Sequence, residues 1–142
     1  MNEIISQTLV KGLAAQQKGR HEEAESLYKT ILRSEPFHAE ANHNLAMLEF
    51  ANNNIEEALK LFKTALVSDP KIKKFWLSYI EALVQGGKLE TAKKVYEKGR
   101  KTGLTGDAVD ALELLLNKSK AKKRINNRAR PSEQEITDMI ES

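Results

Sequence analysis

Cysteine is absent from the sequence, which excludes disulfide bonds, thiolate catalysis and metal sites with cysteine ligands. This absence fits a reducing compartment, and we expect a cytoplasmic protein. Glycine and proline are sparse, with 7 and 3 residues, and their regular placement marks boundaries between segments. No stretch approaches the ~18 consecutive apolar residues of a membrane span. The N-terminus lacks the features of a signal peptide, so we expect neither a leader nor a transmembrane segment.

The net charge of +3 is unevenly distributed along the chain. Residues 1–117 carry 16 basic and 16 acidic side chains, so this part is neutral. Residues 118–130 carry seven basic side chains and no acidic one, whereas residues 131–142 carry four acidic side chains and no basic one. The basic character therefore belongs to one short segment.

A pattern with a period of 34 residues runs through most of the chain. The segments 19–36, 53–70 and 87–104 are three versions of one sequence. Residue types recur at this spacing in five sets, which are Gly19/Asn53/Gly87, Ala24/Ala58/Ala92, Leu27/Leu61/Val95, Tyr28/Phe62/Tyr96 and Pro36/Pro70/Leu104. A fixed period of this size indicates a repeat architecture.

Each set has a physical reason. Gly or Asn accepts the left-handed backbone conformation that follows a helix, so the first set predicts turns. The small Ala allows a neighbouring helix to approach, and the aromatic four residues later lies on the same helix face. Proline ends the second helix. Three- and four-residue spacing of apolar side chains predicts first helices at roughly 5–18, 39–52 and 73–86.

This pattern resembles the tetratricopeptide repeat, a helix–turn–helix unit of 34 residues. The resemblance covers 5–38, 39–72 and 73–106 and implies an all-α fold, a right-handed α-solenoid. The third copy departs from the family pattern, because Gly99 stands for an alanine and Leu104 for the proline. Helix pairs that stack on one another bury the apolar faces that a single helix pair would leave exposed.

The end of the solenoid needs a cap, and residues 106–117 supply a candidate helix. Val109, Leu112, Leu115 and Leu116 form its predicted apolar stripe, and we expect seven helices in a domain spanning 1–117. Residues 118–130 are interpreted as a frayed helix end or a basic linker. In 131–142, Ser132 and Glu135 form a capping box ahead of an apolar stripe, which predicts a short amphipathic helix. It is interpreted as the start of a further repeat in a longer protein, or as a terminal helix that docks on the body.

No catalytic constellation is recognisable, and we expect neither an enzyme nor a cofactor. His21, His38 and His43 lack the i, i+4 spacing of a helical metal site, and we expect surface histidines and no metal. Acidic pairs at helix starts are interpreted as favourable partners of the helix dipole. The basic run lacks aromatic side chains for base stacking, so we interpret it as a solvated linker and consider nucleic-acid binding unlikely.

The family resemblance implies that the first helix of each pair lines a concave groove. Carried over by register, the candidate partner-binding residues are Leu9, Leu13, Gln17, His43, Asn44, Met47, Phe50, Lys74, Leu77, Ser78 and Glu81. Ser6, Val10, Gln16, Glu40, Ala51, Val84 and Gln85 occupy further groove positions. An exposed surface with this many apolar side chains indicates a protein or peptide partner. Packing between repeats is an alternative explanation for some of these residues.

Two specificities of the family can be compared with this groove. The carboxylate clamp that binds heat-shock chaperone termini uses Lys, Asn, Asn, Lys and Arg, where this chain has Leu9, Leu13, Asn44, Lys74 and Ser78. Only two positions agree, so we do not expect that specificity. The stretch ANHNLAML is similar to repeats that precede O-linked N-acetylglucosamine transferases, and related bacterial repeats precede sulfotransferases or methyltransferases.

Three hypotheses follow. The chain is a non-catalytic scaffold that binds a peptide or protein segment in the groove. Alternatively, it is the N-terminal recognition module of a larger transferase whose catalytic domain is absent here. The third hypothesis is a solenoid that self-associates as a homo-oligomer through the groove or the C-terminal helix.

Overall fold

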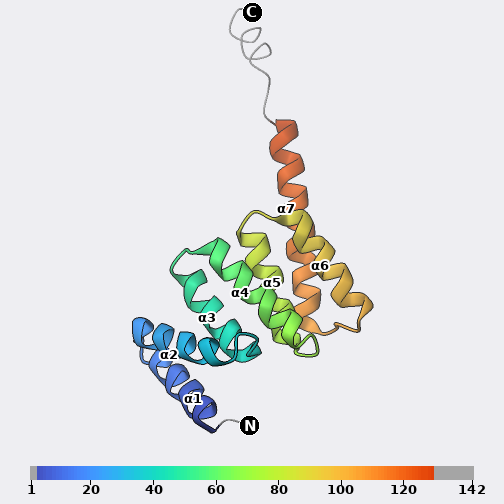
Figure 1. Ribbon diagram of the computed structural model, residues 1–142. Coiled ribbons are helices and arrows are strands. Elements are labelled where there is room, and N and C mark those ends of the chain that lie inside the picture. The colour runs from blue at the N-terminus through green and yellow to red at the C-terminus, as the bar shows by residue number, and fades with distance from the viewer. Residues whose placement is uncertain (1–2, 130–142) are drawn as a thin grey trace, which may run out of the picture.

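The computed structural model describes residues 3–129, with side chains up to Lys118, and these residues form seven helices (Figure 1). The helices are α1 (Glu3–Gln17), α2 (His21–Ser34), α3 (Ala39–Ala51), α4 (Ile55–Ser68), α5 (Lys73–Gln85), α6 (Leu89–Lys101) and α7 (Asp107–Ala129). The described part contains no strand. Each of the first six helices packs mainly on its neighbours in the chain, and α7 packs on both α5 and α6. The predicted all-α solenoid is thereby confirmed.

The turns within the helix pairs have the predicted backbone conformation. Gly19 and Gly87 both have φ of 77°, and Asn53 has φ of 65°. Asn53 is the only residue other than glycine with a positive φ in the described part of the chain. Because L-residues avoid this region, the turns select the two residue types that enter it at least cost.

The junctions between pairs share a hydrogen bond that also recurs with the repeat. Asn42 Nδ2 donates to the carbonyl of Pro36 at 3.0 Å, and Trp76 Nε1 donates to the carbonyl of Pro70 at 2.8 Å. Donors and acceptors are each 34 residues apart. Two unrelated side chains therefore perform the same task, because each satisfies a carbonyl that lies beyond a helix end.

The recurring alanines and aromatics form the interior of each pair. Ala24, Ala58 and Ala92 are completely buried, and Phe62 of α4 belongs to the largest core cluster. The departures in the third copy have a packing explanation. A side chain at Gly99 would lie 3.1 Å from the ring of Trp76 and 2.9 Å from Leu104, so these two large residues occupy the space that an alanine would need.

The cap is longer than predicted. Val109, Leu112 and Leu116 are buried as expected, whereas Leu115, predicted in the same stripe, is 38% exposed. Of the two interpretations of 118–130, the helix end agrees with the structure of residues 118–129 and the linker does not, because α7 continues to Ala129. Lysine, arginine and alanine have high helix propensity, so the helix can continue without a periodic apolar stripe. The predicted helix at 131–142 lies outside the described residues.

Within residues 3–129, no helix combines the length and apolarity that crossing a bilayer requires.

Candidate functional site

The candidate site is the surface formed by the first helices of the three pairs, α1, α3 and α5. The exposed predicted residues are Gln17, Met47, Lys74 and Glu81, and the partly exposed ones are Leu9, Leu13, Phe50, Leu77 and Ser78. His43 and Asn44 are buried. We call the nine exposed or partly exposed residues the first-helix surface.

Two side-chain contacts connect α3 to α5 along this surface. Lys74 Nζ donates to Glu40 Oε1 at 2.7 Å, and this is also an ion pair. His43 Nε2 lies 2.8 Å from Ser78 Oγ, where a hydrogen bond joins the two side chains. Both contacts connect successive repeats, and Glu40 and Lys74, 34 residues apart, occupy corresponding positions, whereas Ser78 lies one residue beyond the position equivalent to His43.

His43 corrects the expectation of three surface histidines, because it is only 7% exposed. Its ring contacts Phe75 with a centroid separation of 5.1 Å and Phe62 edge-on at 5.6 Å. Burial lowers the pKa of His43 below the ordinary 6.5 and nearby Lys74 lowers the pKa further, while Asn44 and Glu40 oppose the shift. The imidazole is therefore neutral at pH 7 and serves as a packed contact between repeats.

Asn44, the second buried member, has a side-chain amide nitrogen without a hydrogen-bond partner in the described part of the chain. His43 Nδ1 is in the same situation. Burial of a polar atom without a partner costs free energy, so these two atoms are weak points of the packing between α3 and α5.

The apolar members give the surface its chemical character. Met47 is 44% exposed in the middle of α3. Phe50 lies one turn further along α3 and contacts Phe62 edge-on, with ring centroids 6.4 Å apart. Leu77 of α5 packs against the main core cluster with part of its side chain exposed. The helix pairs hold these side chains in place and leave part of each one open to solvent.

The two remaining histidines have separate positions. His21 is the first residue of α2 and is exposed, whereas His38 precedes α3, where its Nδ1 accepts a hydrogen bond from the backbone amide of Ala41. No group of three or more metal-ligating side chains exists among the described residues.

A cavity that the sequence did not predict lies away from this surface. It is formed by the loop after α4, the first turn of α5 and the loop between α6 and α7, and its volume is about 570 Å³. The signal in the sequence was the combination of Trp76, Gly99 and Leu104, each of which departs from the other copies. These departures indicate different packing at that junction, but periodicity alone does not predict an opening.

The comparisons with known proteins agree with the helix-pair architecture. A profile described as tetratricopeptide repeat matches residues 9–71 and 43–106. No curated protein matches the chain. The TPR domain of Sgt2 from Aspergillus fumigatus has 27% identity and a TM-score of 0.73, with 92% of this chain and 87% of that domain covered.

Two further solved structures show the same fold at lower identity. The first TPR of Spaghetti (RPAP3), bound to an HSP90 peptide, is 20% identical with a TM-score of 0.73, covering 82% of this chain and 93% of that one. The type III secretion chaperone SycD of Yersinia enterocolitica, in complex with a peptide of the translocator YopD, is 15% identical with a TM-score of 0.70. Its alignment covers 89% of this chain and 97% of that one.

Proposed function

Since the chain belongs to the tetratricopeptide repeat family, we propose that it is a non-catalytic scaffold that binds a peptide or protein segment on its first-helix surface. The observation that carries the proposal is the exposed Met47 among partly exposed apolar side chains on α1, α3 and α5. Apolar side chains fixed by a rigid scaffold and left open to solvent favour burial against a partner. Peptide complexes of the structurally similar RPAP3 and SycD domains support the same class of function.

The preferred segment is apolar rather than an acidic chain end. Lys74 is one of the two residues that match the carboxylate clamp, and Glu40 already neutralises it at 2.7 Å. Asn44 is the other, and it is buried. A terminal carboxylate would therefore compete with an existing ion pair, whereas an apolar segment would need only the side chains of Leu13, Met47 and Leu77.

A peptide display selection on the full chain tests this proposal. We expect the selection to enrich apolar peptides whose binding weakens at least about tenfold in Met47→Glu, because a buried charge would replace apolar contact. Val67→Glu is the matched control, since Val67 is an exposed apolar residue on α4, and its substitution should leave binding unchanged. Thermal unfolding of both variants shows whether the fold is preserved.

The proposal fails if no peptide is enriched, or if the enriched peptides bind Met47→Glu as well as the original chain. A large loss of stability in Met47→Glu would show that Met47 is a packing residue. In that case a photo-reactive side chain at Leu13 should still crosslink to enriched peptides.

The transferase hypothesis is a separate proposal. In it, the same surface would select the protein substrate of a catalytic domain beyond Ser142. The length and sequence of the parent gene test this, and an absence of catalytic sequence after Ser142 would remove the hypothesis.

A further inference from the structure

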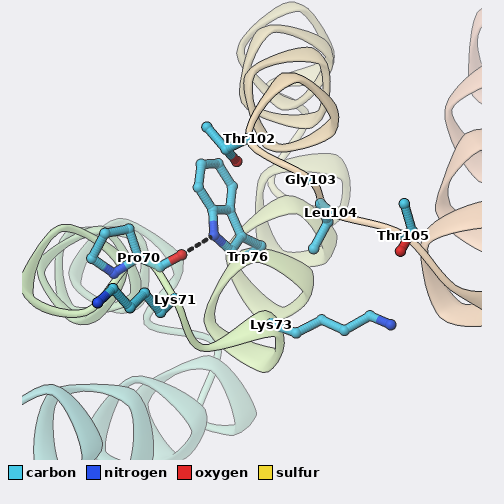
Figure 2. A pocket seen from close by; sticks show the side chains of 8 residues that line it. All are labelled: Pro70, Lys71, Lys73, Trp76, Thr102, Gly103, Leu104 and Thr105. Atoms are coloured by element: carbon cyan, nitrogen blue, oxygen red, sulfur yellow. Dashed lines mark hydrogen bonds between the residues drawn. The ribbon is translucent and has the colours of Figure 1, made fainter.

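The cavity between the loops is an independent candidate binding site. One wall comes from Pro70 to Trp76 and the other from the loop that joins α6 to α7 (Figure 2). Its volume of about 570 Å³ is within the range of ligand sites. None of the residues of the first-helix surface lines it.

The floor of the cavity is apolar and fixed in place. Trp76 is only 6% exposed, and its indole N–H donates to the Pro70 carbonyl. Leu104 from the loop after α6 is also buried and belongs to the same core cluster as Trp76 of α5. A floor of this kind accepts an apolar side chain without rearrangement.

The rim of the cavity is basic. Lys71 and Lys73 form no ion pair in the part of the chain that the structure describes. Figure 2 shows the two side chains extending to opposite ends, Lys71 beside Pro70 and Lys73 toward Thr105. A negatively charged group of a ligand at either end of the cavity would therefore meet one ammonium group that has no ion-pair partner.

The surroundings strengthen this positive field. Segments 70–76 and 98–106, which frame the cavity, carry six basic side chains and no acidic one. Of these six, only Lys74 and Arg100 have ion-pair partners within the described residues. The Lys73 ammonium lies so close to Gly106 that a side chain there would collide with it. It is therefore beside the positive end of α7, which favours an anion between them, although Asp107 in the first turn offsets part of this field.

We propose that this cavity binds the acidic segment 131–142 from a second copy of the chain. The segment carries four acidic side chains and no basic one, and it contains Ile136, Met139 and Ile140. It therefore matches both properties of the cavity, because acids can pair with Lys71 and Lys73 while an apolar side chain reaches Trp76. Opposite charges on two surfaces of one chain lead to association between copies.

The length of α7 favours a second copy over the same chain. The helix starts beside the cavity, next to Thr105, and its end extends away from the other helices (Figure 1). Its 23 residues span about 34 Å at ~1.5 Å per residue. A return over that distance within one chain would use about ten residues of the segment in an extended conformation at ~3.4 Å each, so most of its acidic and apolar side chains would lie along α7 instead of in the cavity. A second copy has no such restriction.

Nucleic acid fits this site less well. A stacked base needs a whole open aromatic face, and Trp76 is only 6% exposed, which leaves room for contact with one aliphatic side chain but not for stacking.

A reciprocal charge reversal in the full chain tests the proposal. Light scattering over a dilution series at low salt should show a dimer or larger assembly whose association weakens about tenfold or more in Lys71→Glu/Lys73→Glu. A variant with Glu133, Glu135, Asp138 and Glu141 changed to lysine should also lose association with itself. Mixing the two variants should restore a complex, because each supplies what the other lacks.

Two controls separate this site from others. Lys60→Glu/Lys63→Glu makes the same charge change at exposed positions of α4 and should leave association intact. Met47→Glu should also leave association intact. The experiment therefore distinguishes failure of the proposal for the first-helix surface from failure of the proposal for the cavity. Circular dichroism shows whether each variant is folded.

Trp76 supplies a direct second readout, because it is the only tryptophan of the chain. Titration of a synthetic peptide of residues 131–142, which contains no aromatic residue, should change the tryptophan fluorescence of the wild-type chain. A peptide with its acids replaced by lysine should not. A monomer at all concentrations without a fluorescence response would overturn the proposal, as would competition by RNA without any effect of the acidic peptide.

Discussion

At the residue scale, the turns show how one backbone angle restricts the sequence. Asn53 has a positive φ at the position where the other two copies have glycine. A side chain with a Cβ atom in this conformation costs ~1–2 kcal/mol per residue, and asparagine reduces that cost through local hydrogen bonding. The turn therefore tolerates asparagine or glycine.

Replacement of Asn53 by alanine should destabilise the fold by ~1 kcal/mol, whereas replacement by glycine should change stability by only a few tenths. Asn52→Ala is the matched control, because Asn52 has an ordinary φ of −84°. Urea unfolding followed by circular dichroism measures the differences. Equal effects of the two alanine variants would show that the backbone angle does not restrict residue 53.

The sequence predicted these turns because the left-handed conformation admits few residue types. It did not predict the hydrogen bonds from Asn42 and Trp76 to the proline carbonyls, because asparagine and tryptophan are dissimilar residue types and do not register as a repeat. Their equivalence appears only when donor and acceptor are placed in space. Similarly, Gly99 departs from the repeat pattern because Trp76 fills the space beside it, which the sequence alone does not reveal.

At the element scale, the junction of α3 with α5 shows the limit of register arguments. The repeat correctly placed His43 on a first helix, but it could not show that Phe62 and Phe75 enclose the ring. Exposure depends on side chains from two other helices, and the three-residue spacing of one helix contains no information about them. For the same reason the sequence could predict which residues lie on the first helices, while it could not predict the burial of Asn44.

The buried histidine predicts a dependence of stability on pH. Burial lowers the pKa of His43 in the folded state, whereas the unfolded chain has the ordinary value of 6.5. Below pH 6.5 the unfolded state therefore binds more protons, and stability falls as the pH decreases toward the folded-state pKa. His43→Gln keeps a hydrogen-bonding side chain near Ser78 and should remove part of this decrease. Urea unfolding between pH 7.5 and 5 measures it.

His21→Gln is the control for this experiment, since His21 is exposed at the start of α2. It should retain the full pH dependence of the original chain. An identical decrease in the His43→Gln variant would assign the effect to carboxylates and contradict the assignment to His43.

At the scale of the whole molecule, contacts pass from each helix to the next, so stability is a sum over neighbouring interfaces. α7 is the last of these neighbours and covers α5 and α6 with Val109, Leu112 and Leu116. The sequence predicted this cap from its apolar spacing, and it failed to predict the length of α7 because the second half of the helix has no apolar spacing to recognise. In a linear stack of helices, a destabilising substitution at one end should reduce the stability of the neighbouring helices only.

Leu112→Ala tests this property. A buried leucine replaced by alanine costs ~2–5 kcal/mol, and we expect the loss of hydrogen-exchange protection to concentrate in α5, α6 and α7. Protection of α1 and α2 should decrease much less, because the interfaces of α2 with α3 and of α4 with α5 separate them from the cap. Leu45→Ala in α3 is the reciprocal variant and should reduce protection mainly in α1 to α4. Uniform loss of protection in both variants would mean that the seven helices unfold as one cooperative unit, and the additive description of the solenoid would then be wrong.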